Sequence, residues 1–180
     1  MALQHQSAHA ATRNPLALAW LAVAVVVVLL DWWTKHLAST HLALYEAQAV
    51  FPWLNWRLAH NPGAAFSFLA GAGGWQRWFF TVLALAVSIF LVAWLFRTRR
   101  DERLVPLALV LVMGGAIGNA IDRLRFGYVV DFIDVHARGW HWPAFNVADS
   151  AIVCGIILLL LDAFREFLAE RKARSGDQPS

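Results

Sequence analysis

The chain has 180 residues, of which 59% are hydrophobic and only 15% are charged, whereas about a quarter of the residues of a typical soluble domain are charged. This composition favours a single domain in a lipid bilayer over a water-soluble enzyme or binding protein. The formal net charge of +3 comes without a basic stripe on a polar face, so we expect no nucleic-acid partner.

Four long apolar runs come close to or meet the roughly 17 to 25 residues that a helix needs to cross the hydrocarbon layer. They predict transmembrane helices over residues 16–33, 75–96, 104–121 and 145–161. The first run follows Arg13 as a secretory signal would, but no small-x-small cleavage site follows it, so we expect a retained helix. The single cysteine, Cys154, lies in the fourth run, where we expect a buried apolar thiol.

The distribution of basic residues predicts the orientation of these helices. The loop between the second and third helices and the segment after the fourth helix hold Arg97, Arg99, Arg100, Arg103, Arg165, Arg171, Lys172 and Arg174. By the positive-inside rule, this loop and both termini face the cytoplasm, and residues 32–74 and 122–146 face outward. Eight of the ten tryptophans lie in or beside these outward segments, as in an interfacial aromatic belt.

The outward segments also contain two extended stretches. Residues 51–59 show partial period-two alternation, which favours a strand on the membrane surface, and residues 127–135 form a second stretch that can pair with it. We assign residues 15–173 to one membrane domain, with cytoplasmic tails at residues 1–14 and 174–180.

Polar side chains gather at the outer end of the predicted bundle. An ionisable residue at membrane depth is costly and is a functional candidate by default. The helices carry Asp31, Asn119, Asp122, Arg123, Asn146 and Asp149, and the outer segments carry Asn61, Asp131 and Asp134. A proton-coupled transporter or channel would instead need polar groups near the bilayer midplane, and the second and third helices are apolar there.

Asp131 and Asp149 are the candidates for a catalytic pair. Two carboxylates placed close together separate their pKa values by like-charge repulsion, so one can act as base and the other as acid. They lie 18 residues apart, and this spacing permits contact without establishing it. As isolated residues, Asp149 would complement a helix dipole and Asp131 would occupy a strand end or turn.

Three neighbouring candidates also have two interpretations each. Arg123 either orients a carboxylate or substrate carbonyl, or is an arginine that reaches toward the membrane interface. Asn146 stands three residues before Asp149, at a good position for a helix N-cap. Asn61 begins an Asn-Pro-Gly sequence that has the composition of a tight turn.

Five blocks of the sequence resemble, in order, the signature blocks of the lipoprotein (type II) signal peptidases, also called prolipoprotein signal peptidases. They are DWWTK (31–35), NPGAAF (61–66), GGAIGNAIDR (114–123), VVDFID (129–134) and FNVADS (145–150). Together they are far more specific than any single block. The resemblance therefore covers residues 31–150.

The resemblance implies roles for seven residues. Asp131 and Asp149 would be the catalytic pair of an aspartic endopeptidase. The residues that would position the substrate or support the pair are Asn61, Asn119, Arg123 and Asn146, with Asp31 as a structural or auxiliary polar residue. No cofactor or metal is implied.

The resemblance also implies a fold, a reaction and a location. The fold is an all-α membrane protein, a four-helix bundle with a small outer-face β cradle and a short outer-face helix. The reaction is cleavage of a diacylglyceryl-modified prolipoprotein on the amino side of its lipidated cysteine. It would take place at the outer face of a bacterial inner membrane, with this substrate and membrane lipid as partners, and we expect a monomer.

Two other classes of hydrolase fit the sequence less well. A metalloprotease could use His60, His136 and His141, but no H-E-x-x-H motif occurs and these histidines have loop spacing. A serine–lysine hydrolase would need Ser150 or Ser67 close to Lys35, and nothing in the spacing favours this pairing.

Overall fold

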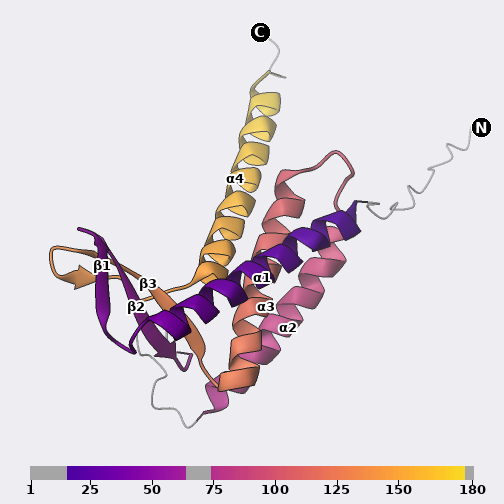
Figure 1. Ribbon diagram of the computed structural model, residues 1–180. Helices are drawn as coiled ribbons and strands as arrows, with labels where there is room; N and C mark the ends of the chain where they lie inside the picture. The colour runs from indigo at the N-terminus through magenta and orange to yellow at the C-terminus, as the bar shows by residue number, and fades with distance from the viewer. Residues whose placement is uncertain (1–15, 64–73, 177–180) are drawn as a thin grey trace, which may run out of the picture.

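The computed structural model describes residues 16–63 and 74–176. Its helices are α1 (Ala17–His41), α2 (Trp75–Leu95), α3 (Leu104–Phe126) and α4 (Val147–Gly176), and its strands are β1 (Ala47–Phe51), β2 (Leu54–Asn61), β3 (Val129–Ala137) and β4 (Trp140–His141). All four helices are long and apolar enough to cross a membrane. Figure 1 shows the sheet beside the end of α1. The predicted membrane bundle with a small sheet is therefore confirmed.

Three helices continue beyond their apolar runs. The helix α1 ends at His41, α3 at Phe126 and α4 at Gly176. In α3 and α4 the added residues include good helix formers such as arginine and glutamate, whereas in α1 the added turns are held by tertiary contacts of Lys35 and Ala38. The predicted tail at residues 174–180 thus starts within α4, and residues 177–180 lie outside the described part of the chain. Residues 16–63 and 74–176 contain no fifth helix, so the implied short outer-face helix is not among them.

The helix α3 lies at the centre of the bundle. In its most apolar window 56% of the residues are buried, against 22% or less in the other helices, and it packs against all three. Helices in a membrane associate through close packing of small residues. A Cβ added to Gly114 would lie 2.8 Å from the Val27 Cβ, and one added to Gly118 would lie 2.6 Å from Asp31 Oδ2. Glycine therefore lets α1 approach closely enough to bury Asp31 against α3.

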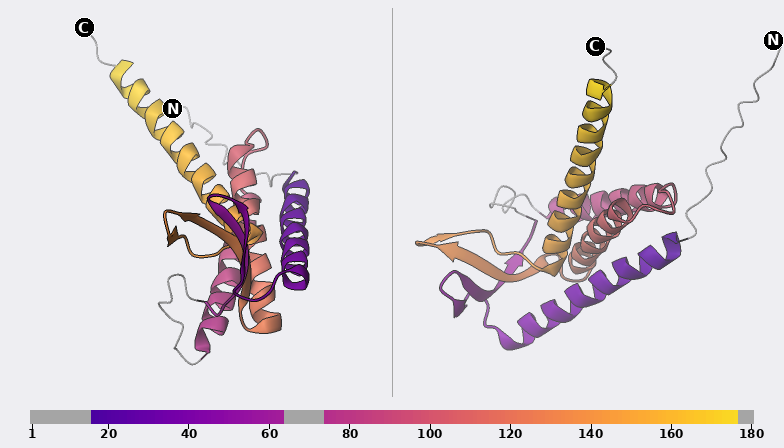
Figure 2. Two further views of the ribbon diagram at one scale, coloured as in Figure 1. Left: turned by 60° about the vertical axis from the view of Figure 1, so that its left-hand side comes forward. Right: turned by 90° about the horizontal axis from the view of Figure 1, so that it is seen from above.

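The start of α4 packs on α3 in the same way. Gly115 lies against the backbone of Ala148, and a Cβ added to Gly155 would lie 2.7 Å from the carbonyl oxygen of Ala108. Further along, α4 diverges from the other helices (Figure 2). Cys154 is exposed on α4, so the expectation of a buried thiol is wrong. Most of α4 faces outward because only one side of the helix, as far as Leu159, contacts the bundle.

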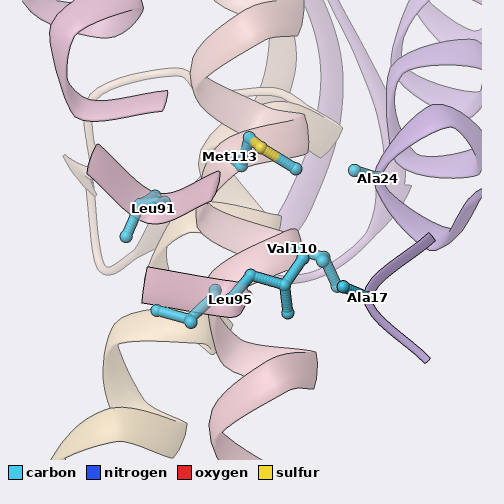
Figure 3. Close-up of a cluster of buried hydrophobic side chains, with 7 residues drawn as sticks. Ala17, Ala24, Leu91, Leu95, Val110 and Met113 are labelled. Carbon is cyan, nitrogen blue, oxygen red and sulfur yellow. The ribbon is translucent and has the colours of Figure 1, made fainter. Parts of the chain in front are cut away.

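Two hydrophobic clusters hold the elements together. The first joins α1, α2 and α3 (Figure 3) and contains Ala17, Ala24, Leu91, Leu95, Leu109, Val110 and Met113. The second joins the end of α1 to the sheet and contains Ala38, Leu58, Val130 and Phe132. The sheet is therefore fixed to the bundle by apolar contacts at the end opposite the first cluster.

The sheet has the order β1-β2-β3-β4 and is antiparallel throughout. The predicted pairing of two outer stretches is confirmed as β2 with β3, in which Ala59 lies opposite Asp131 and Asn61 opposite Val129. The strand β1 was not predicted, because all five of its residues are exposed and a strand without a buried face has no alternation to recognise.

The turn between α3 and β3 positions Asp131. Gly127 ends α3 with a positive φ of 84°, and its N–H donates to the carbonyl oxygen of Arg123 at 3.1 Å. Glycine is favoured at this left-handed position because it has no Cβ. The chain therefore enters β3 at once, and Asp131 follows close to the end of α3.

Candidate active site

Asp131 is a buried carboxylate that accepts two amide hydrogen bonds. Only 2% of the surface of this residue is exposed. Asn61 Nδ2 donates to Asp131 Oδ2 at 3.0 Å, and Asn146 Nδ2 donates to Asp131 Oδ1 at 2.8 Å. Burial and then the charge of Asp149 raise the pKa of Asp131 to about 7, against the lowering effect of these hydrogen bonds. Asp131 can therefore carry a proton at neutral pH.

Asp149 lies in the first turn of α4 and is half-buried. Its Oδ2 accepts from the backbone N–H of Asn146 at 3.2 Å, and Asn146 Oδ1 accepts from the backbone N–H of Asp149 at 2.9 Å. This reciprocal arrangement is a capping box. Asp149 Oδ1 accepts from Asn119 Nδ2 at 2.7 Å. Both carboxylate oxygens of Asp149 are thus held by N–H donors.

Asn146 is the hydrogen-bond partner that the two aspartates share. Its side-chain carbonyl caps α4, while its amino group donates to Asp131. Asn146 therefore caps α4 and at the same time contacts both aspartates. Through this fully buried residue, Asp131 and Asp149 share one hydrogen-bond partner.

Arg123 borders the pair without contacting either carboxylate. Its Nη1 donates to the carbonyl oxygen of Asn119 at 3.3 Å, and its guanidinium lies 5.1 Å from the centre of the Phe80 ring. Within residues 16–63 and 74–176, no carboxylate lies within 4.0 Å of this guanidinium. Its buried Nε has no hydrogen-bond partner there. Arg123 therefore keeps donors for a group from outside the chain.

Asp31 is not part of the pair and lies inside α1, which continues beyond the predicted end at residue 33 to His41. It is 1% exposed; its Oδ1 accepts from the backbone N–H of Ala148 at 2.9 Å and its Oδ2 accepts from Lys35 Nζ at 2.7 Å. Asp31 thus joins α1 to the N-terminus of α4.

Lys35 is a site residue that the sequence reasoning did not select. It is 4% exposed, and its ammonium contacts Asp31, Asp122 Oδ2 at 2.9 Å and Asn119 Oδ1 at 2.9 Å. The i, i+4 spacing of Asp31 and Lys35 in an apolar helix was the available signal. Ser150 instead donates to the carbonyl oxygen of Asn146, so it does not pair with Lys35, and the other candidate serine, Ser67, lies outside the described residues.

Of the three outer histidines, His141 contacts a different aspartate, Asp134. Asp134 accepts from Asn55 Nδ2 at 3.0 Å and pairs with His141 Nδ1 at 2.8 Å, on the opposite face of β3 from Asp131. Burial acts to raise the pKa of Asp134, but these contacts hold it below its usual value. The described residues contain no group of three or more histidine, cysteine, aspartate or glutamate side chains arranged to hold a metal ion.

Comparison with known proteins identifies the family of this chain. A family model described as signal peptidase (SPase) II matches residues 23–165. The chain belongs to the signal peptidase II family. The resemblance drawn from the five sequence blocks is therefore confirmed.

Relatives of this signal peptidase II chain cover most of its length. The lipoprotein signal peptidase of Acinetobacter baumannii is 53% identical over 163 residues, which cover 91% of this chain and 92% of that protein. The lipoprotein signal peptidase of Ralstonia nicotianae is 51% identical over 146 residues, which cover 81% of this chain and 84% of that protein. A bacterial membrane enzyme solved by the in meso method at 2.3 Å superposes with a TM-score of 0.73 at 30% identity, over 94% of this chain and 97% of that one.

Two substitutions of Asn146 separate its capping function from its support of Asp131. Asn146→Ser keeps an N-cap side chain but loses the amino group, whereas Asn146→Ala loses both and should cost about 1 kcal/mol more, the usual value of an N-cap. We expect both variants to lose peptidase activity and Asn146→Ala to have the lower Tm in detergent. Equal activity of native protein and Asn146→Ser would show that the amino group has no part in the site.

Proposed function

We propose that this member of the signal peptidase II family is an aspartic endopeptidase whose catalytic pair is Asp131 and Asp149. The observation that carries this proposal is the shared partner Asn146, which holds a buried carboxylate and a half-buried one within a single hydrogen-bond network. The two environments differ, and a pair whose environments separate its pKa values can supply an acid and a base.

The geometry supports a division of labour between the two aspartates. Asp149, whose oxygens are held by N–H donors, accepts a proton from the attacking water. Asp131, with a pKa of about 7, donates its proton to the oxygen of the scissile carbonyl. The tetrahedral intermediate then collapses as Asp149 returns its proton to the leaving nitrogen, the C–N bond breaks, and the new carboxyl group returns a proton to Asp131.

Arg123 supports this reaction as a donor to the substrate backbone. Its guanidinium lies close enough for its charge to interact with both aspartates, yet it forms no ion pair with them. A planar cation with unused donors suits a peptide carbonyl that approaches the pair.

The proposed substrate is a diacylglyceryl-modified prolipoprotein, cleaved on the amino side of its lipidated cysteine. Relatives that are 53% and 51% identical are lipoprotein signal peptidases. The four membrane-capable helices suit this substrate, because they place the polar site at one end of an apolar bundle, where a lipid-anchored chain can reach it.

Replacement of either catalytic carboxylate tests the proposal. Asp131→Asn and Asp149→Asn should each lower kcat by roughly 10³-fold or more, since each keeps the side-chain shape and removes the acid or the base. The measurement is cleavage of a diacylglyceryl prolipoprotein by purified protein in the presence of a chelator. Asp101→Asn, in the exposed loop between α2 and α3, is the control and should retain native kcat. Near-native cleavage by either catalytic variant, or loss of native cleavage on chelation, would exclude the pair.

The pH dependence tests which aspartate carries the proton. Asp131 must be protonated to donate, and its pKa is about 7, so kcat should fall as the pH rises through this value. The pair titrates as a unit, so the profile reports the pair. The measurement is kcat between pH 5 and pH 9, roughly, with folding checked at each pH by near-UV circular dichroism. A rate that stays constant up to the alkaline end would contradict an acid of this pKa.

The positive-inside rule supports an orientation with both termini in the cytoplasm and the site near the outer face of a bacterial inner membrane. Two exposed positions test it in a Cys154→Ser background: Trp140→Cys in β4 and Arg100→Cys between α2 and α3. A membrane-impermeant maleimide should label Trp140→Cys in intact spheroplasts and Arg100→Cys only after lysis. The reverse pattern would mean that the protein is inserted the other way round.

A further inference from the structure

Lys35 is a buried ammonium whose three protons have three acceptors. Its Nζ lies 2.7 Å from Asp31 Oδ2, 2.9 Å from Asp122 Oδ2 and 2.9 Å from Asn119 Oδ1. An ammonium can only donate hydrogen bonds, so each group that faces it must present an oxygen. None of these three acceptors belongs to the proposed catalytic pair. Lys35 therefore reaches that pair through Asn119.

This donor determines which end of the Asn119 amide faces the pair. The carbonyl and amino ends of an asparagine have nearly the same shape, so the neighbouring groups decide its orientation. Because Oδ1 faces Lys35, Nδ2 faces Asp149 and donates to its Oδ1 at 2.7 Å. In the reversed orientation, the amino group would face an ammonium and the carbonyl oxygen would face a carboxylate, and both contacts would be repulsive.

The oriented amide of Asn119 in turn directs Asn146. The same Asn119 Oδ1 accepts from Asn146 Nδ2 at 3.1 Å, and this amino group donates to Asp131 Oδ1 at 2.8 Å. The carbonyl end of Asn146 is thereby left for the backbone N–H of Asp149. Asn119 Oδ1 thus accepts from both Lys35 and Asn146, Asn119 donates to Asp149, and Asn146 donates to Asp131.

We infer that Lys35 is a positioning residue of the peptidase: it orients Asn119, and through it Asn146, so that amide N–H groups face Asp149 and Asp131. This inference rests on the proposed aspartic function. The charge of Lys35 acts in the same sense, since burial raises the pKa of Asp131 and the positive charge opposes that rise. The orientation of the two asparagines and the positive charge of Lys35 both favour a catalytic pair that holds one proton and not two.

The test removes the donor while keeping the net charge of the buried cluster of Lys35, Asp31 and Asp122 unchanged. Lys35→Met alone would strand two buried carboxylates, Asp31 and Asp122, and so threaten folding. The double variant Lys35→Met, Asp122→Asn removes one positive and one negative charge together. Its matched control is Asp122→Asn, which keeps the ammonium on Asn119. A second double variant, Lys35→Gln, Asp122→Asn, restores an N–H donor without the charge.

We expect kcat of the Lys35→Met, Asp122→Asn variant to be roughly 10- to 100-fold below that of Asp122→Asn, with little change in KM, because misplaced reactive groups slow the chemistry more than binding. The alkaline limb of its kcat profile should move up by about half to one pH unit, less than the shift that a charge in direct contact causes. The Lys35→Gln, Asp122→Asn variant should recover part of kcat.

The outcomes separate this inference from the proposed function. Rates are compared at equal folded fraction. A purely structural role of Lys35 would lower Tm and leave the pH dependence of kcat of the folded protein unchanged. That result, or equal losses in the Lys35→Met and Lys35→Gln double variants, would overturn the inference. Activity of Asp131→Asn or Asp149→Asn would instead overturn the proposed function, whatever the Lys35 variants show.

Discussion

The burial of one ammonium group among oxygen acceptors is the constraint on which the rest of this site depends. Lys35 lies between α1 and α3, and its partners connect further elements: Asp31 accepts from the N-terminus of α4, and Asp122 accepts from the backbone N–H of Val130 in β3 at 3.1 Å. A buried charge is tolerated only where its hydrogen bonds are satisfied. The groups that accept the hydrogen bonds of Lys35 therefore bring together the helices and the strand that carry the candidate catalytic residues.

The same few side chains serve both folding and the site. Asn146 caps α4 and contacts both aspartates, so the start of that helix and the pair form together. Gly118 leaves room for Asp31, and Gly127 ends α3 just before β3. A site at the end of a membrane bundle has few layers of protein around it, so the same side chains stabilise the fold and shape the site. Its low-dielectric surroundings also raise the pKa of Asp131.

The sequence by itself determined the helices and the family, because both depend on local information. An apolar run long enough to cross a bilayer has few alternatives to a helix, and five ordered blocks identify signal peptidase II without coordinates. The pairing of β2 with β3 was also predictable from two outer stretches. The helix ends were less predictable, since helix propensity extends α4, and tertiary contacts extend α1, beyond the apolar residues that mark them.

Only the tertiary structure decided how the polar residues are connected, because hydrogen bonds between distant segments leave no periodic pattern in a sequence. Asp131 and Asp149 were candidates by residue type, but their common partner Asn146 became evident only once β3 and α4 were placed. The sequence does not single out Lys35, because a lysine one turn from an aspartate in a helix is compatible with many roles. Its three contacts, which come from α1 and α3, exist only when these helices pack through the glycines of α3.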